Sequence, residues 1–231
     1  MKNDSSVSGA NDVAAVESKR TRLALDLIHQ HADSESTEIS VLLQAMRKMR
    51  EAVVSSGRID VFARTSYLFI IRATILLGHM ESYHPALLYV HGSIHPEVAL
   101  SDDDLHEVLS YRVLDTACRR ADLNAAHEMQ TVYNFHDAKV ESIVKSIAHG
   151  NWTRFWKLRS FLTTMQARVA DFACERMRKH ALDCLGRSYL SIDKDSVEKI
   201  LRKSWDAVAR DYASHWTLNE DTVVIRQTKR K

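Results

Sequence analysis

Glycine and proline are scarce in this chain, with 6 glycines and 2 prolines among 231 residues. Average usage of the two together would place about 28 in a chain of this length. Tight turns consume these residues, so their scarcity predicts few turns and long regular elements. Many-stranded sandwiches, barrels and propellers are disfavoured, because each hairpin needs its own turn chemistry. The glycines are also spaced too widely for a dinucleotide-binding G-x-G-x-x-G, a P-loop or a G-x-S-x-G elbow.

The remaining composition is ordinary for a protein with a sizeable core. Hydrophobic residues make up 45% and charged residues 27%, and the formal net charge of +2 predicts neither nucleic-acid nor membrane binding overall. The longest apolar run, residues 67–77, is interrupted by Arg72 and is too short to span a bilayer. Residues 1–10 are polar and do not resemble a secretory signal. We therefore expect a soluble protein of the cytoplasm, the nucleus or both.

Three cysteines, Cys118, Cys174 and Cys184, lie within apolar helical patterns. Their odd number fits a reducing compartment with free, buried thiols. A catalytic cysteine needs a base and an electropositive, exposed setting. Cys118 precedes Arg119 and Arg120 but has no second signal of this kind. The pattern therefore favours inert core cysteines over a nucleophile.

The first two thirds of the chain carry a helical pattern. Residues 1–16 are rich in Ser, Asn and Asp and are expected to form a disordered tail. Residues 17–163 have apolar side chains at spacings of three and four, which predict helices joined by short polar breaks. Pro85 is expected to open a short helix, and Gly92 with Pro96 to interrupt the helix after it. Short connections favour antiparallel neighbours, so the predicted fold is mainly α, an irregular right-handed helical-repeat solenoid.

The C-terminal segment, residues 164–226, differs because strand patterns appear in it. A long helix is expected over residues 164–185, followed by a short strand over residues 189–192. Asp193 and Ser204 are expected to cap two further helices, since their side chains can accept hydrogen bonds from the first backbone N–H groups. A strand and two helices that follow a long helix are most of the parts of a winged helix-turn-helix.

A hairpin completes this predicted winged helix. Residues 216–218 and 223–225 alternate at period two around the polar loop 219–222. Four apolar side chains are expected to bury one face of the hairpin, whose outer edge would accept a strand from another chain: Trp216, Leu218, Val223 and Ile225. Residues 227–231 form a basic tail that is expected to fray.

A glycine-asparagine pair marks the joint between two predicted helices. Gly150 can adopt the left-handed conformation that ends one helix, and Asn151 can cap the next. The aromatic side chains of that next helix, Trp152, Phe155 and Trp156, are expected to pack into the groove between neighbouring helices.

The stretch around this joint resembles the PCI family of scaffold subunits. The segments SIAHGNWTRFWKLRSFL and VADFACERMRKHALDCLGRSYLSI look like its helix pair, long helix and first strand, and WTLNEDTVVIR looks like its wing hairpin. The resemblance covers residues 58–231. It is strongest with the SAC/GANP export branch and with the small proteasome-lid, signalosome and initiation factor three k subunits grouped with that branch.

This resemblance implies a non-enzymatic scaffold that joins other PCI-domain subunits through its winged helix. It favours an RNA-processing or mRNA-export assembly, with the proteasome lid, the signalosome and translation initiation factor three as alternatives. In several of these assemblies a small acidic partner protein rides on the PCI subunit, and the resemblance implies such a partner here.

Basic residues are concentrated in residues 151–187, where eight basic side chains stand against three acidic ones. A basic surface beside exposed aromatic rings would suit single-stranded RNA, and a stand-alone RNA-binding module is therefore a second hypothesis. The alternative is a solvated helix face whose charges pair with acidic partners. Seven residues are the candidate contacts for RNA or an acidic partner: Arg154, Lys157, Arg168, Arg176, Arg178, Lys179 and Arg187.

Two further chemistries are disfavoured. The second helix of the predicted winged helix carries Asp206, Arg210 and Asp211, without a base-reading cluster, so sequence-specific DNA binding is not expected. His91 and His95 are spaced like helical zinc ligands, but no glutamate lies between them and no Cys pair is near. We accordingly expect no metal site, no cofactor and no catalytic residue, and an enzyme is the least favoured class.

Overall fold

The computed structural model describes residues 18–30, 37–212 and 215–226. The two predicted tails, residues 1–16 and 227–231, lie outside these described residues. The chain divides into two compact units, Met1–Arg112 and Val113–Lys231. The predicted change from helical array to winged helix at residue 164 falls within the second unit and stays a prediction.

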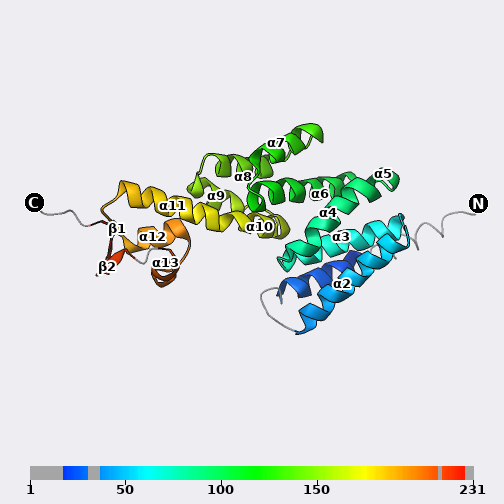
Figure 1. Ribbon diagram of the computed structural model, residues 1–231, viewed down its shortest axis with the longest axis horizontal. Helices are drawn as coiled ribbons and strands as arrows, with labels where there is room; N and C mark the ends of the chain where they lie inside the picture. Colours follow the sequence, from blue (N-terminus) through cyan, green and yellow to red (C-terminus); the bar gives the residue numbers. More distant parts are fainter. Residues whose placement is uncertain (1–17, 31–36, 213–214, 227–231) are drawn as a thin grey trace, which may run out of the picture. The chain divides into compact units, whose positions relative to one another are not determined.

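The described part of the first unit is entirely helical (Figure 1). Residues 18–30 form a helix ahead of α2. A π-helical turn, η1, joins α4 to α5, and the last helix runs two residues into the second unit. The elements are α2 (Thr37–Ser55), α3 (Val61–Leu76), α4 (Met80–Tyr89), η1 (Val90–Ile94), α5 (His95–Glu97) and α6 (Asp102–Leu114).

Helix α3 is buried on nearly all sides, as expected for a helix that is apolar around its circumference. It packs against α2 and α4. Its polar stripe faces α6 and the segment before it. Arg64 donates to the carbonyl of Ala99 at 2.6 Å. The Nη2 of Arg72 donates to Asp104 Oδ1 at 2.8 Å and to Glu107 Oε2 at 2.5 Å, both on α6. Two carboxylates thereby compensate the desolvation of the Arg72 guanidinium, whose pKa they raise above its usual range.

Pro85 lies inside α4 and not at its start, so the expectation that Pro85 opens a short helix is wrong. The helix begins earlier because Gly78 ends α3 in the left-handed conformation, with φ of 66°, and the chain turns at once into α4. Proline within a helix removes one backbone hydrogen bond. The buried side chains of Tyr83 and Leu87 hold the flanking turns in place and offset that loss.

The expected interruption at Gly92 and Pro96 is also wrong, because the chain stays helical from α4 through η1 to α5. The wider spacing of the π turn brings the N–H of His95 to the carbonyl of Val90. Pro96 then falls in the first turn of α5, where a helix does not need the N–H that proline lacks.

The second unit continues with helices and ends in a small sheet. The long helix expected over residues 164–185 is confirmed as a near-continuous succession of α10, a 3₁₀ turn and α11. The helical elements before the sheet are η2 (Asp115–Arg119), α7 (Leu123–Val132), α8 (Ala138–Ala148), α9 (Trp152–Arg159), α10 (Thr164–Ala170), η3 (Asp171–Ala173) and α11 (Cys174–Ser188).

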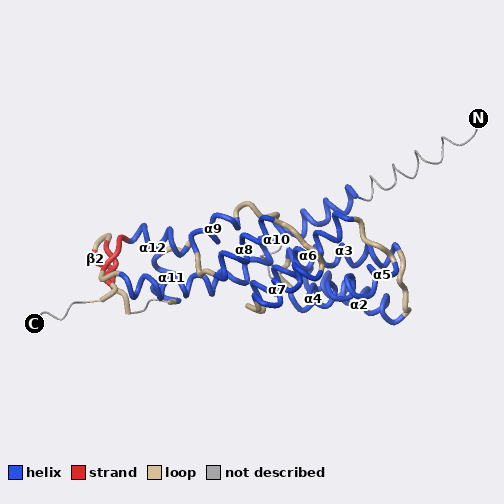
Figure 2. Tube along the Cα trace, turned by 90° about the horizontal axis from the view of Figure 1, so that it is seen from above, coloured by secondary structure: helices blue, strands red, loops and turns tan. Residues whose placement is uncertain are grey.

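A winged helix follows α11, so the predicted fold class of a helical stack with a C-terminal winged helix is confirmed. It consists of β1 (Ser191–Asp193), α12 (Lys194–Leu201), α13 (Trp205–Asp211), β2 (Thr217–Asn219) and β3 (Thr222–Val224). The strands form an antiparallel sheet of order β1-β3-β2 beside α11 and α12 (Figure 2). Pairing of Asn219 with Thr222 shortens the predicted four-residue loop to Glu220 and Asp221.

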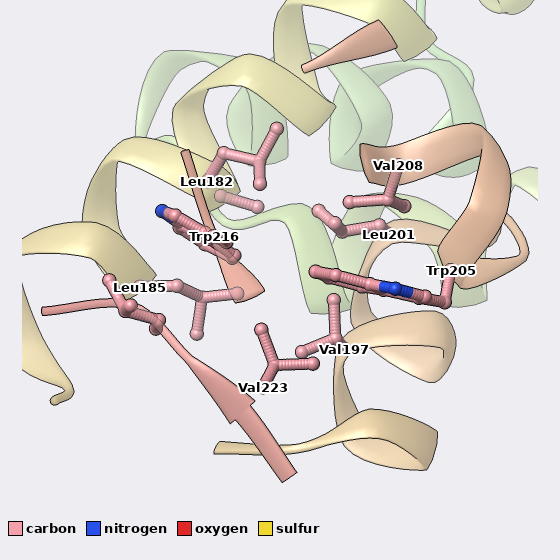
Figure 3. Packing of buried hydrophobic residues seen from close by; sticks show 10 residues of the cluster. Leu182, Leu185, Val197, Leu201, Trp205, Val208, Trp216 and Val223 are labelled. Carbon is pink, nitrogen blue, oxygen red and sulfur yellow. The ribbon is translucent and has the colours of Figure 1, made fainter. Parts of the chain in front are cut away.

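The core of the winged helix joins its helices to its sheet (Figure 3). Leu185 of α11, Val197 of α12 and Val223 of β3 point into the same interior, and Val197 and Val223 are fully buried. The cap predicted for α13 is wrong in one respect: Ser204 makes no side-chain cap. The carboxylate of Glu198 instead accepts the N–H of Trp205 at 2.7 Å, because α12 brings it to that helix start.

Candidate interaction surfaces

The wing hairpin presents one buried face and one edge. Trp216 and Ile225 are each 6% exposed and Val223 is fully buried, whereas Leu218 is 37% exposed. The expectation that all four side chains are buried is therefore wrong for Leu218. This residue lies on the edge strand β2, next to Val223 in the register, where only one neighbouring strand covers it.

The register also determines where the backbone of β2 points. The two-residue loop makes Asn219 and Thr222 the closing pair of the hairpin, which exchanges hydrogen bonds. Hydrogen-bonded and non-bonded pairs alternate along an antiparallel ladder, so the pair of Leu218 and Val223 is non-bonded. The N–H and C=O of Leu218 accordingly face the outer edge of the sheet. Among the described residues, no strand pairs with that edge.

The Gly150–Asn151 joint has the geometry that the sequence predicts. Gly150 has φ of 61°, and the Asn151 side chain accepts the N–H of Arg154 at 2.9 Å. Gly150 meets a second constraint, because a Cβ at this position would lie 2.4 Å from Nε2 of His180. The joint therefore favours glycine for its backbone conformation, and the His180 side chain of α11 would have to move to make room for a Cβ.

The three aromatic side chains of α9 have separate roles. Phe155 is fully buried. Trp152 packs against the core of the winged helix and meets the ring of His180 edge to face, with centroids 5.7 Å apart. Trp156 donates its indole N–H to the carbonyl of Ile200 at 3.0 Å. Through these contacts α9 holds the winged helix to the helices before it.

Two of the predicted basic contacts are used inside the protein. Arg176 donates to the carbonyls of Ala117 and Cys118, at 3.0 and 3.2 Å. Arg178 donates from Nε to the carbonyl of Leu201 at 3.0 Å, and its side chain is 18% exposed. The expectation that these residues belong to one free basic surface is wrong, because their guanidinium groups satisfy carbonyls at the ends of other helical segments.

The other five basic candidates are distributed over α9, α10 and α11. Arg154, Lys157 and Arg187 are exposed, and no carboxylate pairs with them among the described residues. Lys179 is exposed with its Nζ 3.7 Å from Glu175 Oε1. Arg168 is half-buried on α10. The exposed positive charge of residues 151–187 is thus smaller than the sequence count indicates.

The sequence pattern does not predict the ion pair that joins α9 to η3. Arg159 donates from Nε and Nη2 to the two carboxylate oxygens of Asp171, at 2.5 and 2.9 Å. Twelve positions separate the two residues, so no helical spacing marks them as partners. Arg202 was also missed. It stands at the end of α12 in the left-handed conformation, with φ of 54°, and its side chain is exposed.

The three cysteines are free, and two of them are buried. Burial raises the pKa of the Cys174 thiol to about 12 and that of Cys118 above its usual range. Cys184 is only half-buried, so the expectation that it lies on a buried face is wrong. Its Sγ lies 3.8 Å from Nε2 of His180, at the exposed side of α11.

His91 and His95 lie on consecutive helical turns, with ring centroids 6.2 Å apart. Nδ1 of His91 lies 2.6 Å from Arg112, and Nδ1 of His95 accepts the N–H of Leu100 at 3.1 Å. Burial and the Arg112 charge lower the pKa of His91 to about 4. The rings serve hydrogen bonds within the fold. In the part of the chain that the structure describes, no three His, Cys, Asp or Glu side chains are grouped as metal ligands.

The helical stack and its terminal winged helix place the chain in the class of helical proteins that end in a winged helix. Residues 136–231 match the model of the CSN8/PSMD8/EIF3K family. This match to a PCI-related family confirms the resemblance drawn from the Gly150 region and the wing. No curated protein matches the chain in sequence.

None of the described helices is both long enough and apolar enough to cross a membrane.

Proposed function

We propose that this protein is a non-catalytic scaffold subunit of a multi-subunit assembly of the proteasome-lid, signalosome or initiation factor three type. The match of residues 136–231 to the CSN8/PSMD8/EIF3K family supports this proposal, since members of that family are non-catalytic subunits of such complexes. A cytoplasmic or nuclear location accords with it.

The open edge of β2 is the surface that we propose for assembly. The N–H and C=O of Leu218 face outward, and its side chain adds an apolar contact that is already 37% exposed. A strand from another PCI-domain subunit could pair with this edge, because main-chain hydrogen bonds supply affinity wherever a sheet edge is open. The register of β2 is the single observation that carries this assignment.

Substitutions of Leu218 separate the backbone contribution from that of the side chain. Leu218→Pro removes the outward N–H without removing a hydrogen bond inside the hairpin, because the inward bonds belong to Thr217 and Asn219. Leu218→Thr keeps the N–H and removes apolar surface. We expect affinity purification with mass spectrometry to recover other PCI-domain subunits with the wild type, fewer with Leu218→Thr and fewest with Leu218→Pro.

Recovery of the wild-type protein as a lone monomer would contradict the scaffold proposal. If Leu218→Pro recovers as many partners as the wild type, the scaffold proposal stands but the wing edge is not the interface. The same purification identifies the assembly. An mRNA-export complex would support the SAC/GANP branch, whereas a lid, signalosome or initiation-factor complex would support the branch named by the matching family.

For the exposed basic side chains we propose contact with an acidic partner protein in preference to RNA. Two of the seven candidate residues, Arg176 and Arg178, donate to backbone carbonyls within the fold, so the exposed positive charge is local and not a continuous track. Single-stranded RNA is bound by a track of cations with stacking aromatic rings. Charge reversal of Arg176 and Arg178 is not a suitable test of RNA binding, because the loss of their hydrogen bonds would disturb the fold.

A further inference from the structure

An open groove of about 890 Å³ lies in the second unit, between α9, the region around the η3–α11 junction and the C-terminal end of α12. Among the charged residues that line it, cations outnumber anions. The cationic side chains are Lys157, Arg159, Arg178 and Arg202, and the anionic one is Asp171.

Two backbone carbonyls at the end of α12, beside this groove, are already paired with side chains. The last carbonyls of a helix lack partners within the helix and carry partial negative charge. Here the carbonyl of Ile200 accepts the indole N–H of Trp156, and the carbonyl of Leu201 accepts the Nε–H of Arg178, both at 3.0 Å. The Arg178 guanidinium also lies 5.3 Å from the centre of the Trp156 ring. These contacts hold the wall of the groove in place and cap the helix dipole.

The remaining charges leave an excess of cations. Arg159 neutralises Asp171 through two hydrogen bonds. Burial raises the pKa of Cys174, which lines the same groove, to about 12, so its thiol carries no charge near neutral pH. Lys157 and Arg202 are exposed, and neither pairs with a carboxylate in the described ranges. Their charges are available to an external anion.

We propose that this groove binds an acidic peptide segment of a partner protein, whose carboxylates pair with Lys157 and Arg202. This inference rests on the proposed scaffold function and gives its acidic partner a specific site. Carboxylates form charge-assisted hydrogen bonds with Lys and Arg side chains, and an acidic peptide can supply several of them along the groove. The hydroxyl group of Thr153 on α9 adds a hydrogen-bond donor to the same groove.

Nucleic acid fits this groove less well than a peptide does. Trp156 is the one aromatic side chain among the described residues that line it. Arg178 covers a face of that ring, and the carbonyl of Ile200 takes its N–H. Stacking of successive bases on exposed rings, which supports single-strand binding, therefore has little surface here.

Fluorescence anisotropy on the full chain tests the proposal with three probes. These are a labelled twelve-residue peptide of alternating Asp and Glu, the corresponding Asn and Gln peptide, and a ten-nucleotide oligo-uridine. We expect the acidic peptide to bind, with an affinity that falls as salt increases, and the neutral peptide to bind at least tenfold more weakly. The double variant K157E/R202E should lose about tenfold in affinity for the acidic peptide.

A charge-matched variant separates the groove from overall charge. R120E/K139E makes the same change in net charge at two exposed positions outside the groove, and it should alter affinity less than twofold. The milder K157Q/R202Q should give an intermediate loss, and circular dichroism verifies that each variant is folded. The proposal is overturned if the wild type does not bind the acidic peptide, if both charge-reversal pairs weaken binding equally, or if oligo-uridine binds more tightly than the peptide.

Because these titrations use the isolated chain, they are independent of the wing edge. Loss of PCI partners from Leu218→Pro in cells with unchanged peptide binding supports both proposals. If the chain binds the acidic peptide but recovers no PCI subunit from cells, the groove proposal is supported and the scaffold proposal is contradicted.

Discussion

The indole N–H of Trp156 donates to the carbonyl of Ile200, 44 positions later in the chain, at 3.0 Å. This bond joins α9 to the C-terminal end of α12 and so connects the helices to the winged helix. Trp156→Phe removes the donor and leaves the carbonyl without a partner. We expect it to lower the free energy of unfolding by about 1–2 kcal/mol more than Trp152→Phe does, since only the former breaks this hydrogen bond. Urea denaturation measures both, and equal losses would contradict the role assigned to Trp156.

Substitution of Gly150 tests the close approach of His180. Gly57 and Gly150 have nearly the same φ, 62° and 61°, but a Cβ at Gly57 would meet nothing within 4 Å. Gly57→Ala should therefore lower stability by about 1 kcal/mol through backbone strain alone. Gly150→Ala should lower it further, because His180 must swing away from Trp152. In a His180→Ala background the two alanine variants should cause equal losses, and a difference that persists there would contradict this explanation.

Thiol labelling distinguishes the three cysteines. Cys184 is half-buried, whereas burial raises the pKa of Cys118 and of Cys174, the latter to about 12. Because the thiolate is the reactive form, Ellman's reagent at pH 8 should titrate one thiol quickly in the folded protein and all three after denaturation. Cys184→Ser should abolish the fast phase. Rapid labelling of two or three thiols in the native protein would contradict the burial of Cys118 and Cys174.

Stability below neutral pH should depend on His91. Its pKa is lowered to about 4 in the folded protein, first by burial and then by the charge of Arg112. The unfolded chain, with a pKa near 6.5, therefore binds more protons between pH 6.5 and 4, and stability falls as the pH is lowered through this window. His91→Gln can still accept from Arg112 but does not titrate. Melting temperatures from pH 7 to 4 should fall less steeply for the variant, and parallel curves would contradict the prediction.

Arg202 adopts a left-handed backbone conformation that glycine tolerates better than arginine does. Arg202→Gly should therefore raise the free energy of unfolding by about 0.5–1 kcal/mol. The same variant should bind the acidic peptide more weakly, since it removes a groove cation. Arg202→Ala removes the cation without the conformational gain, so it should weaken binding to a similar extent without stabilising the fold. Denaturation and anisotropy measured together separate the two effects.

Local patterns in the sequence were sufficient for most of the fold. Helical periodicity located the helices, and the Gly150–Asn151 pair located the joint before α9, because cap and termination signals act on neighbouring residues. The errors occur where packing overrides those signals. Pro85 sits inside α4, where buried apolar contacts offset the hydrogen bond that proline cannot make. Pro96 falls in the first turn of α5, where its missing N–H is not needed.

The candidate surfaces were less predictable than the fold. Period-two alternation identified the hairpin, but the exposure of Leu218 depends on which strand lies at the edge of the sheet. A count of basic residues identified the charged segment but could not separate Arg176, which satisfies carbonyls of η2, from Lys157, which faces a groove.

By itself the sequence determined that the chain is helical, that its C-terminal part ends in a winged helix of the PCI type, and that it lacks a phosphate-binding glycine loop. These properties follow from spacings of a few residues, over which propensity, capping and periodicity act. Only the tertiary structure decided which charges are free and which edge is open. Charge pairing and strand order depend on residues far apart in the chain, such as Arg159 with Asp171 and Trp156 with Ile200, whose proximity no local pattern encodes.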